Sequence, residues 1–167
     1  VREMKKKVTS ANIDYLVIVT SVSRPKFKQG ILDRYLVRAH QWGVHPLVVF
    51  NKMDQFSARK VDLEFEALRI EDLQADLFEV SVIQQNYRPQ FLSYGLSELQ
   101  EKLRGATALF VGQSGVGKSE TISALSGGGV HLKTGEVGKA GKGSHTTTWT
   151  EIVDLEAFSL IDSPGIR

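Results

Sequence analysis

The chain has 167 residues, the size of a single domain, and it has no cysteine, which excludes a disulfide scaffold and any cysteine-bound zinc or iron–sulfur site within these residues. A hydrophobic content of 41% and a charged content of 24% exclude a collagen-like, coiled-coil or low-complexity chain, and no apolar run approaches the ~18 residues that a membrane helix needs. The net charge of +2 is nearly balanced, so any contact with nucleic acid has to come from local basic patches.

Short apolar runs rich in β-branched residues alternate with helical patterns along the chain. The runs are apolar nearly throughout, which is typical of strands that are buried on both faces. Strands are predicted at residues 16–20, 46–50, 77–82, 106–111, 152–155 and 158–161. Only two residues separate the last two runs, so we expect that pair of strands to be antiparallel.

Helices are predicted between the strands from apolar residues at three- and four-residue spacing. The stripes are Ile31, Leu32, Tyr35, Leu36 and Ala39; then Val61, Phe65 and Leu68; then Leu99 and Leu103, after a capping box from Ser97 to Gln100; and last Ile122 and Leu125. Alternating strands and helices predict an α/β fold with a mostly parallel sheet. Loops are expected at 21–30, 84–95 and 127–148, and the last, rich in Gly and Lys, is long enough to be functional or disordered.

The segment G-Q-S-G-V-G-K-S at 112–119 fits the phosphate-loop pattern G-x-x-x-x-G-K-[ST]. Its glycines allow backbone N–H groups to curl around phosphate oxygens, and the N-terminus of the following helix adds unpaired donors. We expect Lys118 to act catalytically on the β- and γ-phosphates and Ser119 to bind magnesium. A chance glycine-rich turn is the alternative, and the strand–loop–helix context disfavours it. The residues predicted to bind phosphates are Gly112, Gln113, Ser114, Gly115, Val116, Gly117, Lys118, Ser119 and, through its backbone N–H, Glu120.

The segment N-K-M-D at 51–54 directly follows a predicted strand, at the end where open α/β sheets bind ligands. The Asp54 carboxylate can accept both the N1–H and the 2-amino donors of guanine, a pair that adenine lacks. Lys52 can lay its methylene stem over the base, and Asn51 can tie this loop to the phosphate loop. Backbone N–H groups of Ser81 and Val82 are weaker candidates for contact with the guanine O6. The alternative for N-K-M-D is a turn with an aspartate helix cap.

Two segments near the end of the chain predict metal and γ-phosphate contacts. In D-S-P-G at 162–165, Asp162 can hold magnesium through water and the Gly165 N–H can sense the γ-phosphate. In H-T-T-T at 145–148, Thr147 or Thr148 can complete the magnesium shell, as in GTPase switch loops. An ordinary Pro-Gly turn and a polar loop that enters a strand are the respective alternatives.

The order of these motifs is unusual. An ordinary GTPase runs from the phosphate loop through the switch threonine and D-x-x-G to N-K-x-D, whereas here N-K-M-D comes first and D-S-P-G last. The sequence is the same cycle cut elsewhere, with the splice at residues 103–105, and such a cut is tolerated when the old termini lie close together. The predicted fold is therefore a P-loop NTPase three-layer sandwich in circularly permuted GTPase order.

With this order, the chain resembles the GTPase domain of the ribosome-small-subunit-dependent GTPase A family over essentially all of residues 1–167. The resemblance lies in N-K-M-D, G-Q-S-G-V-G-K-S, H-T-T-T and D-S-P-G-I-R. It implies one G domain that binds GTP or GDP with Mg²⁺ and hydrolyses GTP during maturation of the 30S ribosomal subunit. In that family an RNA-binding OB domain precedes this region and a Cys/His zinc domain follows it, so structural zinc is expected only in that absent domain. The expected partners are the 30S subunit and its 16S rRNA, with no membrane partner, for a monomeric protein of the cytoplasm, or of an organelle in a eukaryote.

Several residues depart from the family pattern. Glu120 stands where the family usually has serine and adds like charge near the phosphates, Val82 replaces an alanine, and residues 83–94 are an apparent insertion. Ile166 stands where GTPases carry the glutamine that orients water, so we predict slow turnover that the ribosome stimulates. His145 is the candidate catalytic residue within the chain, a role to which the resemblance also points; a solvated side chain or an RNA phosphate contact is the alternative.

Two further functions compete with the ribosome-assembly GTPase. A P-loop ATPase of another kind is opposed by Asp54. An RNA- or ribosome-binding module with a degenerate, non-catalytic guanine nucleotide site is supported by Glu120 and Ile166. Basic residues that can neutralise RNA phosphates are Arg2, Lys5, Lys6, Lys7, Lys133, Lys139 and Lys142.

Overall fold

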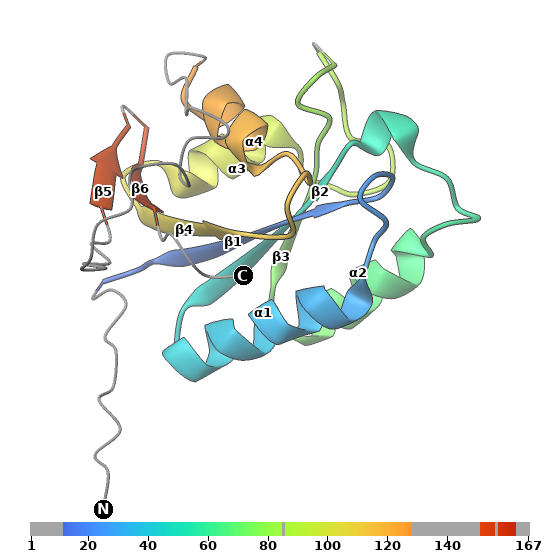
Figure 1. The fold of residues 1–167 in the computed structure, drawn as a ribbon, viewed down its shortest axis with the longest axis horizontal. Coiled ribbons are helices and arrows are strands. Elements are labelled where there is room, and N and C mark those ends of the chain that lie inside the picture. The colour runs from blue at the N-terminus through green and yellow to red at the C-terminus, as the bar shows by residue number, and fades with distance from the viewer. Residues whose placement is uncertain (1–11, 85, 128–150, 156, 163–167) are drawn as a thin grey trace, which may run out of the picture.

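The computed structural model describes residues 12–84, 86–127, 151–155 and 157–162 (Figure 1). Its centre is a six-stranded sheet in the order β3-β2-β1-β4-β6-β5. The strands are β1 (Tyr15–Ser21), β2 (His45–Asn51), β3 (Asp76–Glu79), β4 (Thr107–Val111), β5 (Glu151–Asp154) and β6 (Ser159–Asp162). All neighbouring strands pair in parallel except β5 and β6, which are antiparallel. The mostly parallel sheet and its antiparallel last pair, both predicted from the sequence, are confirmed.

Helices cover both faces of the sheet, so the fold has three layers (Figure 1). The helices are α1 (Gln29–Trp42), α2 (Leu63–Asp72), α3 (Leu96–Leu103) and α4 (Lys118–Leu125), with a short 3₁₀ turn at Met53–Gln55. In Figure 1, α1 and α2 lie below the sheet, and α3 and α4 lie above it. Successive residues of β1 serve opposite layers: Leu16 and Ile18 belong to one buried cluster, Val17 and Val19 to the other. This two-sided burial explains the nearly continuous apolar runs in the sequence.

The buried face of α2 differs from the one that the sequence predicted. Phe65 and Leu68 are 56% and 61% exposed, whereas Leu63 and Ile70 are buried in the core. The Asp62 side chain caps the helix by accepting a hydrogen bond from the Phe65 N–H at 3.1 Å, so the helix begins at Leu63 and its stripe continues through residues 66 and 70. The prediction was wrong because apolar spacing gave the period of the helix without its rotation about the axis.

Two element boundaries, the start of α3 and the end of β3, also differ from the predictions. The helix predicted from a capping box at Ser97 begins at Leu96, because the Glu98 carboxylate accepts from the Gly95 N–H at 2.8 Å and makes Gly95 the N-cap. The strand predicted at 77–82 ends at Glu79. Beyond Glu79 the chain turns towards the end of β2, where the Val80 carbonyl accepts a hydrogen bond from the Met53 N–H at 3.1 Å.

No helix in the described ranges is both long enough and apolar enough to span a membrane.

Candidate functional site

The predicted nucleotide-binding segments gather at one edge of the sheet. N-K-M-D follows β2, residues 80–82 follow β3, and the phosphate loop follows β4. Because these strands are parallel to β1 and to one another, their carboxyl ends lie together. This is the edge at which doubly wound sheets hold ligands.

Two glycines of the phosphate loop occupy positions where a side chain would collide with a neighbouring segment of the chain. Gly112 has φ +148°, and a Cβ there would lie 2.2 Å from the Val19 carbonyl oxygen. Gly117 has φ +96°, and its Cβ would lie 2.3 Å from the Asn51 Nδ2. The loop therefore needs glycine for its backbone angles and for close packing on β1 and on the N-K-M-D segment.

Lys118, the first residue of α4, folds its side chain back over the phosphate loop. Its Nζ donates to the carbonyl of Gly112 at 2.7 Å and to that of Gln113 at 3.2 Å. Partial burial lowers the pKa of Lys118, and the nearby Glu120 carboxylate offsets only part of that effect. A half-buried ammonium whose hydrogen-bond partners are neutral carbonyl groups is suited to an anion, and phosphate oxygens supply that charge.

Asn51 joins all three predicted nucleotide-binding segments. Its side chain is buried, and its Nδ2 donates to the Val116 carbonyl of the phosphate loop at 2.9 Å. Its Oδ1 accepts from the N–H of Lys52 at 2.7 Å and from that of Val82 at 3.4 Å. The link between Asn51 and the phosphate loop that the sequence predicted is present as the hydrogen bond to Val116. The hydrogen bond from Val82, in the segment after β3, was not predicted.

Lys52 makes a second bridge to the phosphate loop. Its Nζ donates to the Gly115 carbonyl at 2.8 Å and also to the Arg24 carbonyl in the segment after β1. The ammonium is thus anchored by backbone carbonyls. Its methylene stem lies between this anchor and the N-K-M-D turn, which suits the predicted contact with the face of a base.

Asp54 is exposed at the end of the sheet, and a buried serine orients its carboxylate. The Ser81 Oγ donates to the Asp54 Oδ1 at 2.5 Å. The sequence predicted a backbone contact for Ser81 and missed this side-chain role. A serine directly after a strand at the sheet's carboxyl edge is the signal that could have indicated it.

Glu79, at the end of β3, is fully buried, and no role was predicted for its side chain. Its carboxylate accepts hydrogen bonds from the Tyr87 hydroxyl and from the backbone N–H groups of Gln90, Phe91 and Leu92. All four donors belong to the apparent insertion at 83–94. A carboxylate within an otherwise apolar run was the available signal, because such a group needs partners when it is buried.

Several predicted site residues lie outside the described part of the chain. These are His145, Thr147, Thr148 and Gly165. Asp162 is the last residue of β6, and its side chain is likewise outside the description. Ser119 and Glu120 lie in the first turn of α4, Ser119 half-buried and Glu120 exposed, and Ser114 is exposed in the loop. Within the described ranges no cluster of three or more His, Cys, Asp or Glu side chains could hold a metal ion.

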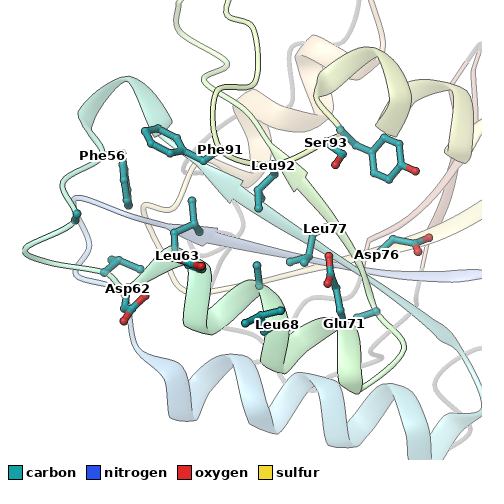
Figure 2. A pocket seen from close by; sticks show the side chains of 16 residues that line it. Phe56, Asp62, Leu63, Leu68, Glu71, Asp76, Leu77, Phe91, Leu92 and Ser93 are labelled. Carbon is teal, nitrogen blue, oxygen red and sulfur yellow. The ribbon is translucent and has the colours of Figure 1, made fainter.

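A groove of about 800 Å³ lies between α2 and residues 91–94 (Figure 2). Phe56 stands near one end of it and Asp76 near the other, and Leu77 also lines it. None of the residues predicted to bind nucleotide is among those that line it. Its walls carry carboxylates rather than cations, so it does not suit phosphates, and the carboxyl edge of the sheet remains the candidate site for nucleotide.

Comparisons with known proteins agree with this geometry. The family model for the RsgA GTPase matches residues 1–167. The small ribosomal subunit biogenesis GTPase RsgA of Shewanella oneidensis is 37% identical over 96% of this chain, which covers 44% of that protein. The same-named protein of Chlorobaculum tepidum is 40% identical over 98% of this chain and 50% of its own length. The chain thus spans about half the length of the curated relatives it matches.

Two solved structures show the same architecture. The crystal structure of YjeQ from Thermotoga maritima matches with a TM-score of 0.66 at 25% identity, over 92% of this chain and 48% of that one. The structure of YloQ, described as a circularly permuted GTPase, matches with a TM-score of 0.61 at 21% identity, over 92% of this chain and 45% of that one. The predicted α/β sandwich in permuted order is therefore confirmed, and the chain belongs to the RsgA GTPase family.

Proposed function

We propose that this chain binds GTP and GDP through a guanine-selective site at the carboxyl edge of its sheet. The observation that carries the proposal is the buried Asn51 side chain, which bonds to Val116 of the phosphate loop and to Val82 after β3. Phosphate-binding and base-binding segments are held as one unit, although they are far apart and inverted in the sequence. Asp54, oriented by Ser81, would accept the paired donors of guanine.

We further propose that the site hydrolyses GTP with Mg²⁺ as cofactor. Magnesium is usually held by one or two protein oxygens together with substrate phosphates and water. The half-buried Ser119, next to Lys118, fits that requirement, and Asp162 with Thr147 or Thr148 would complete the shell. The ion would neutralise phosphate charge. Lys118 would take up the same charge from the protein side by exchanging carbonyl partners for phosphate oxygens.

The small ribosomal subunit is the proposed partner and activator. The printed names of the relatives describe small ribosomal subunit biogenesis GTPases, and the chain shares 37–40% of its residues with them. Turnover by the chain alone would be slow because Ile166 cannot orient water, with His145 as the proposed catalytic residue. Contact with 16S rRNA would run through the lysines of the 127–148 segment. We propose residues 1–167 as one monomeric, cytoplasmic G domain, with OB and zinc domains as its flanks in the family.

A paired titration tests the nucleotide site. Fluorescent GDP and ADP are titrated with Mg²⁺ into this chain and into Asp54→Asn. Binding of GDP without ADP, weakened in the variant by about 10-fold or more, is expected, because a hydrogen bond to a charged group is worth ~1.5–3 kcal/mol. Hydrolysis is then measured with and without 30S subunits. A folded chain that binds neither nucleotide would refute the proposal in favour of the ribosome-binding module with a degenerate site, for which the exposed Glu120 beside the phosphate loop is the supporting observation.

A further inference from the structure

The insertion at 83–94 is organised around one buried carboxylate. Glu79 is 0% exposed, and its Oε1 accepts from the Tyr87 hydroxyl and from the Gln90 N–H at 2.9 Å. Its Oε2 accepts from the N–H of Phe91 at 2.8 Å and from that of Leu92 at 2.7 Å. Four donors converge on the two oxygens, which is nearly the full acceptor capacity of an ionised carboxylate.

The Tyr87 hydroxyl remains a donor in this arrangement. Burial and the hydrogen bond to Glu79 raise the pKa of Tyr87 above its ordinary value, so the phenol keeps its proton. The carboxylate therefore meets donors only. This full set of partners compensates for the cost of burying its charge.

The insertion held by Glu79 contacts both predicted base-binding segments, the one after β3 and the one after β2. Its first residues follow Ser81 and Val82 directly, and the Gln84 N–H donates to the Ser81 carbonyl at 3.2 Å. Its far end returns to the residues just after N-K-M-D, where the Phe91 ring packs against Phe56 with ring centroids 4.7 Å apart (Figure 2). Both ends of the insertion thus bear on the segments that carry Asp54 and Ser81.

We propose that Glu79 is a positioning residue for guanine recognition: by fixing the insertion it holds Ser81, and through Ser81 the Asp54 carboxylate, in the orientation that receives the base. The inference rests on the proposed guanine site and deepens it. Glu79 is fully buried, so it is expected to act without direct contact with the nucleotide. Its effect is transmitted through the Ser81–Asp54 hydrogen bond of 2.5 Å.

A glutamine at this position tests the role of the charge at nearly constant volume. The amide keeps one acceptor oxygen but turns a donor NH₂ towards N–H groups that need an acceptor. On the side that carries the NH₂, the backbone N–H groups of the segment 87–92 lose their acceptor: Gln90 in one orientation of the amide, Phe91 and Leu92 in the other. Because backbone N–H groups must find partners when they are buried, the insertion is expected to shift, and Ser81 with it.

The experiment compares the affinities of GDP and inosine diphosphate, which lacks the 2-amino group that Asp54 would accept. In the unaltered chain GDP is expected to bind at least about 10-fold more tightly than inosine diphosphate, as one hydrogen bond to a charged group implies. In Glu79→Gln this ratio is expected to fall at least about threefold. Glu66→Gln is the matched control, because Glu66 is a buried carboxylate on α2 that pairs with Arg69 away from the site. Its ratio should stay unchanged.

The affinity ratio separates positioning from general destabilisation, since partial unfolding weakens both nucleotides equally. An unchanged ratio in a folded Glu79→Gln overturns the proposal while leaving the guanine site intact. Failure of the unaltered chain to distinguish the two nucleotides refutes the guanine site itself, and the inference with it. If Glu79→Gln does not fold, Tyr87→Phe decides in its place. Loss of that one donor should reduce the ratio by a smaller factor, and an unchanged ratio would again refute the role of Glu79.

Discussion

Replacement of Gly117 by alanine tests whether the phosphate loop and the N-K-M-D segment are as tightly joined as the structure shows. A Cβ at Gly117 would lie 2.3 Å from the Asn51 Nδ2, and the residue has φ +96°. Asn51 cannot move aside freely, because its side chain is buried and its Nδ2 donates to the Val116 carbonyl at 2.9 Å. The substitution should therefore break that bond in the absence of any nucleotide.

The expected loss of stability has two parts. A positive φ costs a non-glycine residue roughly 1–2 kcal/mol, and a buried polar group left without its partner costs about 1–3 kcal/mol. Together they give about 2–5 kcal/mol, which for a chain of this size lowers the melting temperature by roughly 4–20 °C. Circular dichroism during heating measures this shift.

Gly43→Ala is the matched control. Gly43 also has a positive φ, +65°, at the C-cap of α1, but nothing lies within 4 Å of the Cβ that alanine would add. Only the conformational cost of roughly 1–2 kcal/mol applies there. Equal melting temperatures for the two variants would refute the steric argument. A double-mutant cycle sharpens the test: in an Asn51→Ala background, Gly117→Ala should cost little more than Gly43→Ala.

Three further predictions concern Glu120, the ion pair between Lys102 and Asp76, and His145. Glu120→Ser should raise the affinity for GDP by a few fold, with a weaker effect at high salt, because an exposed like charge near the phosphates is removed; an unchanged titration at low salt would contradict this. Burial alone would raise the pKa of Asp76, but hydrogen bonds from Lys102 and His45 outweigh it and hold that pKa below its ordinary value. The stability that these bonds contribute to the fold is therefore fully present above about pH 4 and is lost as the pH falls through the lowered pKa. Lys102→Ala should accordingly lower the free energy of unfolding by under about 1 kcal/mol at neutral pH, because the side chains of Lys102 and Asp76 are both more than a third exposed. The loss should be smaller near pH 3, where Asp76 is partly protonated. Denaturant titrations at both pH values measure the difference, and a larger loss at pH 3 would refute the argument. His145→Ala should reduce 30S-stimulated GTP turnover while GDP binding persists, and full turnover in a steady-state assay would remove the catalytic role.

Much of the candidate nucleotide site could be proposed from the sequence because its motifs are local. The glycines and Lys118 of the phosphate loop lie within eight residues, as does each base-binding segment, and each follows a recognisable apolar run. The inverted order of the motifs was likewise visible without coordinates. A continuous apolar run sufficed to predict β1, whose alternate residues enter the two opposite core clusters.

Tertiary packing decided what local patterns leave open. Spacing fixes the period of α2 but not its rotation, so the Asp62 cap, and not the apolar count, determined that Leu63 is buried and Phe65 exposed. The bond from Asn51 to Val116 joins residues 65 apart in the chain, and such a contact exists only once β1, β2 and β4 have paired. The four donors around Glu79 come from a segment with no regular structure, whose path depends on the buried carboxylate that it surrounds. Local patterns thus identify the groups that are proposed to bind nucleotide, and only the folded chain determines which side chains hold those groups in place.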